Sequence, residues 1–80
     1  MPSALVPLTE LSPGHKAKVS EIRVPSDAQS RLMEMGLLTG TEVELIRFAP
    51  LGDPVEIKVR GYNLSLRRHE ADQILVHTIT

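Results

Sequence analysis

The histidines and carboxylates are the first side chains to weigh for chemistry, because together they can hold a transition metal. His15, His69 and His77 are spread along the chain, and no two of them have the spacing that places ligands on adjacent helical turns. His69 beside Glu70 is the best pair, as surface ligands that a neighbouring molecule could complete. This donor set is poor, so we predict no resident metal and no cofactor, and at most adventitious binding of a transition metal such as zinc.

Covalent catalysis has no support in the residue types. The chain has no cysteine, which excludes a disulfide framework, a thiolate nucleophile and a cysteine-ligated metal or cluster. Serines and threonines occur, but the sequence contains no nucleophile elbow, no glycine-rich phosphate cradle and no paired catalytic carboxylates. We predict a binding protein and not an enzyme.

A basic cluster surrounds one expected hairpin and consists of Lys58, Arg60, Arg67 and Arg68. These residues could contact an acidic partner surface or a phosphate, or they could form an ordinary solvated strand face. Nine basic and ten acidic residues give a formal net charge of -1, so no overall field attracts nucleic acid or an anionic bilayer. One tyrosine and one phenylalanine are too few for the stacked rings of a single-strand binder or a reader of proline-rich peptides. We predict no nucleic-acid partner.

Apolar side chains at the end of an expected helix form the strongest candidate binding surface. That helix needs only one apolar stripe for the core, formed by Ala28, Leu32 and Met35. The flexible methionines nearby suit a surface that adapts to an inserted apolar side chain. The candidate partner-binding residues are Arg31, Met33, Glu34, Leu37, Leu38 and Leu51. The alternative is that the apolar members are core and that Arg31 and Glu34 form a helix pair worth only about 0.2–0.5 kcal/mol.

A short helix positions most of these residues. The sequence predicts it over residues 26–35, opened by a capping box between Ser26 and Gln29. Gly36 is placed to end the helix as a left-handed residue, and Leu37 to fold back onto the last turn, as in a Schellman motif.

Alternating patterns on both sides of the helix predict a mostly β chain. The expected strands cover residues 15–24, 41–48, 55–60, 62–67 and 74–79, with a tight turn at 60–63 and a single helical turn near 68–72. Prolines at positions 2, 7 and 13 predict an irregular segment over residues 1–13 that packs on the body through Leu8 and Leu11. A small antiparallel β-barrel satisfies this order, because a curled sheet buries one face and removes most exposed edges.

The length of 80 residues predicts a single domain, near the size where folding buries only about 60% of the unfolded chain's surface. Hydrophobic residues make up 41% and charged residues 24% of the chain, which is ordinary for a soluble globular domain. No stretch approaches the roughly 18 apolar residues of a spanning helix, and the start lacks a secretory signal. We expect a cytoplasmic domain over residues 1–80 that does not insert into the membrane.

The order and spacing of these pieces resemble the FeoA-like domain, a small SH3-like barrel associated with bacterial ferrous iron uptake. No single piece is specific, but together they cover nearly the whole chain. The matching pieces are Leu11-Ser12-Pro13-Gly14, Arg31-Leu32-Met33-Glu34-Met35-Gly36-Leu37 with Gly40, Gly52-Asp53-Pro54, Gly61, Leu64-Ser65-Leu66-Arg67, Glu70-Ala71 and Ile74-Leu75-Val76.

The resemblance implies a cytosolic accessory that docks on and modulates a FeoB-type iron permease, a membrane protein with its own GTP-binding domain. Two alternatives stay open: a carrier that binds ferrous iron itself, and a stand-alone regulatory domain related to the C-terminal module of iron-dependent repressors. No winged-helix portion precedes the domain in this sequence, which favours the transport accessory. A weak homodimer is a further expectation, through an exposed edge strand at residues 74–79.

Overall fold

Strands dominate the structure, as the alternating patterns predict. The computed structural model describes residues 5–79. The strands are β1 (Leu5–Pro7), β2 (Lys16–Ile22), β3 (Glu42–Phe48), β4 (Val55–Val59), β5 (Tyr62–Leu66) and β6 (Ile74–Thr78). The helices are α1 (Ser26–Glu34), α2 (Arg68–Ala71) and the single 3₁₀ turn η1 (Leu8–Glu10). The predicted helix, hairpin and late helical turn are therefore confirmed.

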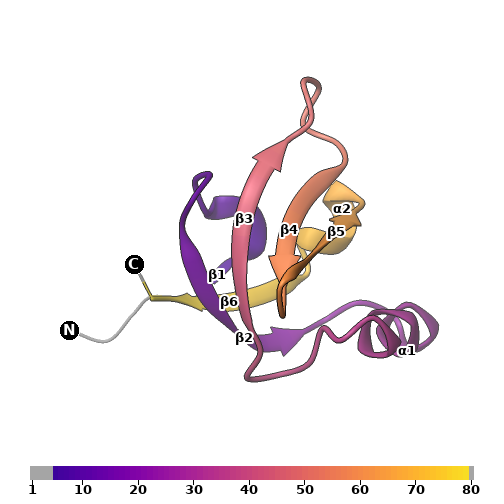
Figure 1. Cartoon of the computed structure of the whole chain (residues 1–80). Coiled ribbons are helices and arrows are strands. Elements are labelled where there is room, and N and C mark those ends of the chain that lie inside the picture. Colours follow the sequence, from indigo (N-terminus) through magenta and orange to yellow (C-terminus); the bar gives the residue numbers. More distant parts are fainter. Residues whose placement is uncertain (1–4, 80) are drawn as a thin grey trace.

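All six strands belong to one antiparallel sheet, in the order β1-β6-β2-β3-β4-β5 (Figure 1). The sheet is strongly curled, and register shifts in β2 and β3 mark bulges, which increase local bending. β1 and β5 each have a strand neighbour on one side only. The sheet is therefore curled but not closed, and the predicted barrel holds only in this loose sense.

The core lies inside the curl and is built from alternate strand residues. In β4, Val55, Ile57 and Val59 are completely buried, whereas Lys58 between them faces solvent. Two-residue periodicity produces this pattern, because successive side chains of a strand point to opposite faces. The largest completely buried side chains are Leu8, Leu32, Leu37, Leu45, Ile57, Leu66 and Ile74, with Val43, Val55, Val59 and Val76.

The N-terminal segment is more regular than predicted. Residues 1–4 lie outside the described part, but Leu5–Pro7 forms β1 and pairs with β6. The expectation of an irregular segment is therefore wrong for these residues. Pro7 does not prevent the pairing because it is the last residue of an edge strand, where a missing N–H is tolerated. Leu8 and Leu11 are buried through the η1 turn, as predicted.

The two ends of α1 differ in how well their sequence signals predict them. At the start, Pro25 is the N-cap and no side chain caps the helix, so the predicted capping box is wrong. Gln29 instead donates to the backbone oxygen of Ile22 at 2.8 Å, tying the helix to the end of β2. At the other end, the Leu37 N–H donates to the Leu32 oxygen at 3.0 Å, and Gly36 has a φ of +94°. This is the predicted Schellman motif.

The C-terminal strand is central and not an edge. β6 pairs with β1 on one side and with β2 on the other. Its backbone donors and acceptors are therefore used within the sheet, and the predicted homodimer through residues 74–79 is wrong in its location. Within the described residues, the strand edges belong to β1 and β5.

A two-residue turn joins β4 to β5. Arg60 and Gly61 both have positive φ, +51° and +88°, and Val59 pairs with Tyr62 on either side of them. Positive φ at both central residues defines a type I′ turn, whose twist matches that of the flanking strands. Arginine is an uncommon residue for this conformation, because its Cβ crowds the backbone there.

A surface ion pair lies just before α1. Arg23 Nε donates to Glu21 Oε2 at 2.5 Å. This hydrogen bond lowers the pKa of Glu21, and the same bond raises the pKa of Arg23. Both side chains are well exposed, so solvent screens the interaction and it adds little to folding stability.

Candidate functional site

The end of α1 presents its apolar side chains at three different depths. Met33 is 51% exposed, Leu38 is half-buried and Leu37 is completely buried. Leu37 is the residue that folds back in the Schellman motif, and its side chain belongs to the core. The prediction that Leu37 binds a partner is therefore wrong, and Met33 and Leu38 are the apolar side chains that a partner can reach there.

Arg31 does not pair with its helix neighbour Glu34. Its Nη2 donates instead to Oε2 of Glu70 in α2, which joins the two helices. Glu70 is only 7% exposed, and its Oε1 accepts the backbone N–H of Arg67 at 3.3 Å. Both oxygens of this carboxylate are thus engaged in holding α2. The prediction of Glu70 as a surface metal ligand beside His69 is wrong, and only His69 remains exposed.

Replacing Arg31 with alanine is expected to reduce the free energy of unfolding by about 1–2 kcal/mol, because a buried carboxylate loses a charged donor. Partial exposure of Arg31 keeps the loss below that of a fully buried pair. Urea denaturation followed by circular dichroism measures it. Glu34→Ala, one turn away and exposed, is the matched control and should change stability by less than about 0.5 kcal/mol. Equal losses in the two variants would contradict a structural role for the Arg31–Glu70 pair.

The remaining apolar candidate, Leu51, belongs to a different surface. It is 96% exposed in the loop between β3 and β4. Arg68 holds this loop: its Nη1 donates to the Gly52 oxygen at 3.2 Å, and its guanidinium lies 5.6 Å from the centroid of the Phe48 ring. Figure 1 shows the loop and α1 at opposite ends of the molecule. The predicted partner-binding set is therefore split between two places.

The predicted basic cluster is also split. Arg68 faces the β3–β4 loop, and Arg67 lies beside Asp53 in a small hollow at the same end of β5. Arg60 and Lys58 lie toward the other end of the hairpin. The five residues of β5, about 17 Å of strand, separate the two groups. The four basic residues are close in sequence, but they lie at the two ends of the hairpin and do not form one cluster.

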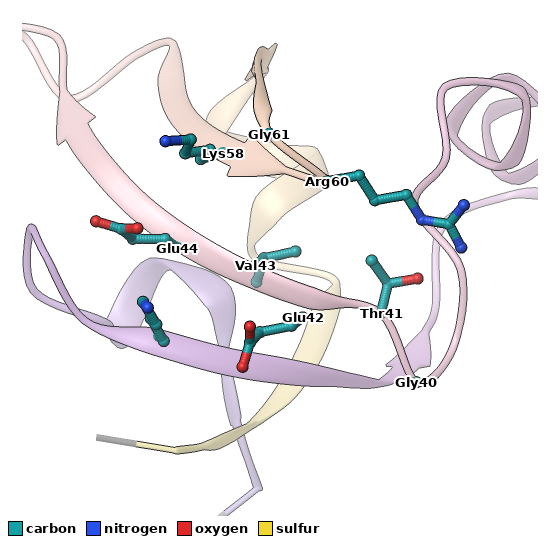
Figure 2. A pocket seen from close by; sticks show the side chains of 9 residues that line it. Gly40, Thr41, Glu42, Val43, Glu44, Lys58, Arg60 and Gly61 are labelled. Carbon is teal, nitrogen blue, oxygen red and sulfur yellow. The ribbon is translucent and has the colours of Figure 1, made fainter.

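Lys58 and Arg60 line a shallow groove of about 540 Å³ over β2, β3 and β4. Figure 2 shows their side chains pointing in opposite directions, with Glu42 and Glu44 rising from β3. Glu44 lies between Lys16 and Lys58 in the strand register. Thr41, Val43, Gly40 and Gly61 complete the lining. Charges of both signs alternate across this groove, so it is not built as a pocket for a simple anion.

Residues 5–79 contain neither a cluster of metal-binding side chains nor a membrane-spanning helix. No three histidine or acidic side chains in this part of the chain gather closely enough to hold a metal ion. No helix there is long and apolar enough to cross a membrane.

Residues 6–78 match the family model described as the FeoA domain. The chain belongs to the FeoA family. A solution structure of the FeoA protein from Chlorobium tepidum is 40% identical with a TM-score of 0.90, over 94% of this chain and 71% of that one. FeoA of Stenotrophomonas maltophilia, described as a procaryotic SH3 domain protein and solved in complex with zinc, is 32% identical with a TM-score of 0.72, over 86% of each chain. The predicted family and SH3-like fold are confirmed.

A FeoA domain of this kind also occurs within a larger relative. The Fe(2+) transport protein A/Fe(2+) transporter FeoB fusion protein of Porphyromonas gingivalis is 36% identical over 73 residues, which is 91% of this chain. The chain spans only 9% of the length of that relative. The rest of the fusion protein has no counterpart in this sequence.

One residue of this FeoA domain was missed as a site candidate. The hydroxyl of Tyr62, at the start of β5, lies 2.9 Å from the position that a Cβ on Gly36 would occupy. The positive φ of Gly36 favours glycine, and a Cβ there would also displace the Tyr62 hydroxyl. Tyr62 is 44% exposed, so the end of α1 and the start of β5 form one continuous surface. Tyr62 is the single tyrosine of the chain, and nothing else in the sequence singles it out. That fact does not indicate a contact with Gly36.

Proposed function

We propose that this FeoA domain is an accessory of ferrous iron uptake that docks on a FeoB-type GTP-binding iron permease and modulates it. The observation that carries the proposal is the relative in which a homologous domain and the transporter FeoB form one polypeptide. Covalent linkage holds two domains at high effective concentration, and it preserves an association that separate chains would make by docking. The domain acts by binding on the cytosolic side and not by catalysis.

The docking face in this proposal is the end of α1. Met33 is the exposed apolar side chain there, and Leu38 offers a half-buried one beside it. Arg31 and Glu34 are exposed on the same helix and supply charges of both signs at the rim. An exposed apolar centre with a charged rim is the arrangement of a protein interface.

The test is a titration of the soluble GTP-binding domain of a FeoB-type permease into isotope-labelled protein. Amide signals of residues 31–38 should shift in a saturable way, while those of the β3–β4 loop should not. Signals that stay unchanged throughout, together with permease transport that is indifferent to the presence of the FeoA domain, would falsify the proposal.

The proposal requires no resident metal. The zinc complex of the Stenotrophomonas maltophilia relative keeps a ferrous iron carrier as the second candidate. In this chain, however, Glu70 is turned inward to Arg31, and His69 is left without its neighbouring carboxylate as a ligand. Zinc at His69 would then be adventitious. Anaerobic calorimetry with ferrous iron separates the two: heat that saturates at one ion per chain at micromolar metal supports a carrier.

A further inference from the structure

The free edge of β5 offers a short row of unpaired backbone groups. Val59 and Tyr62 flank the type I′ turn, and the residues that flank a two-residue turn form a hydrogen-bonded pair. Bonded and non-bonded pairs alternate along an antiparallel ladder. The pairs of Asn63 with Lys58 and of Ser65 with Glu56 are therefore the non-bonded ones. The N–H and C=O groups of Asn63 and Ser65 point away from β4.

Within the described part of the chain, no hydrogen bond occupies these groups. Both Asn63 and Ser65 have exposed side chains, and neither backbone makes a hydrogen bond outside the β4–β5 ladder. The row stops at Arg67, whose N–H donates to Glu70 Oε1 and whose oxygen accepts from α2. β1, the other edge, has only three residues and ends at Pro7, so β5 is the better template for an added strand.

Positive charge surrounds this edge. Arg60 precedes β5, Arg67 follows it, and Lys58 lies opposite Asn63 on the solvent face. The nearby carboxylates are already engaged: Glu56 accepts from Arg47 at 3.0 Å, and Glu70 holds Arg31. Asp53 accepts the Arg68 backbone N–H at 3.0 Å. An occupant with acidic side chains would therefore be attracted to this edge, and a basic one repelled.

These charges also argue against a second copy as the occupant. In the antiparallel register that pairs all five residues of β5 with themselves, Leu64 faces its own equivalent. Arg60 lies just before β5 and Arg67 just after it, so this register brings the Arg60 end of each copy to the Arg67 end of the other. The like charges at both ends repel one another.

We propose that the β5 edge binds an extended, acidic segment of a partner protein as an added strand. Four backbone hydrogen bonds at Asn63 and Ser65 would give the segment its register, and Arg60 and Arg67 would select acidic side chains. The site adjoins the end of α1 through Tyr62 and Gly36. It deepens the proposed function by naming the kind of segment the partner contributes, and it rests on that function only in taking the partner to be a protein.

The test uses no permease. Its probe is an acetylated and amidated five-residue peptide of alternating valine and glutamate, titrated into isotope-labelled protein. The largest amide shifts are expected at Asn63 and Ser65. A matched peptide with lysine for glutamate should bind at least tenfold more weakly, and 0.5 M salt should weaken the acidic peptide severalfold.

Two variants locate the binding. Ser65→Pro removes an outward N–H and no ladder bond, and it should abolish peptide binding. Arg67→Gln keeps the backbone intact and should weaken the acidic peptide severalfold. The same variant should strengthen binding of the lysine peptide, because one repelling charge is removed. Arg67→Gln carries the test if Ser65→Pro does not fold. Lys18→Gln, which removes a positive charge from an exposed position on β2, is the control and should bind the peptide normally.

Shifts confined to other strands, equal binding of the two peptides, or unchanged affinity in Arg67→Gln would overturn the inference. So would a concentration-dependent dimer whose formation shifts the same β5 signals, because the occupant would then be a second copy. Peptide binding without permease binding would keep the inference and overturn the proposed partner. Permease binding that leaves the β5 amides unshifted would keep the proposed partner and overturn the inference about the β5 edge.

Discussion

Leu37→Ala is expected to reduce the free energy of unfolding by about 2–5 kcal/mol, the range for a large aliphatic side chain removed from a core. Leu37 is completely buried at the point where α1 turns into the chain leading to β3. A domain of 80 residues has only about 4–12 kcal/mol of stability in total. The midpoint of thermal unfolding should therefore fall by at least about 10 °C. Urea and thermal denaturation followed by circular dichroism measure both quantities.

The control for this variant is its neighbour. Leu38 is half-buried, so Leu38→Ala should cost less than about 1.5 kcal/mol, because less apolar surface is lost from the core. A larger loss in Leu38→Ala than in Leu37→Ala would contradict the assignment of depths. Leu37→Asp should not fold, since it places a carboxylate where no donor is available. Variants of Leu37 therefore report on the fold and cannot report on docking.

Met33→Asp is expected to weaken binding to the soluble domain of a FeoB-type permease at least about 10-fold, which corresponds to about 1.4 kcal/mol. Met33 is the exposed apolar side chain of the proposed docking face, and apolar anchors at the centre of an interface commonly account for losses of this size or more. The acid near the end of α1 should cost only about 0.5 kcal/mol of folding stability. Calorimetry gives the affinity, and circular dichroism shows that the variant is folded.

Leu51→Asp is the matched control for docking, because it introduces the same charge at an even more exposed leucine. It should leave the affinity for the permease domain unchanged, since the β3–β4 loop lies away from α1 (Figure 1). If Leu51→Asp abolishes binding and Met33→Asp does not, the docking face is the loop that Arg68 holds, and the assignment to α1 is wrong.

Local signals in the sequence predicted the parts of the fold that local physics determines. Gly36 and Leu37 predict the end of α1 correctly, because the Schellman motif lies within six consecutive residues. The alternation of apolar and polar residues in Val55–Val59 predicts β4, because this pattern also lies within a few consecutive residues. The capping box predicted at Ser26 was wrong, because Gln29 instead contacts the end of β2 and holds the start of α1 there. Local sequence patterns do not indicate a contact between two separate elements.

The candidate site was less predictable because its parts meet through long-range contacts. Arg31 has an acidic residue three positions away, yet it pairs with Glu70, 39 residues along the chain. Leu51 and Met33 are both exposed and apolar, but the sequence contains no indication that β3 separates them. The place of β6 between β1 and β2 likewise follows from strand pairing, which short-range patterns do not encode.

The central place of β6 has a consequence for how the chain acquires its structure during synthesis. Leu5 pairs with His77, and Ala17 pairs with Thr78. The first two strands therefore cannot complete their pairing until the last strand has been made. While the ribosome is still making residues before Ile74, β1 has no neighbour and β2 has one open side. Contacts that span nearly the whole chain also slow folding, because loop closure precedes the stabilising contact. The hairpin of β4 and β5 can form early, but the sheet is completed only after residues 74–78 have left the exit tunnel.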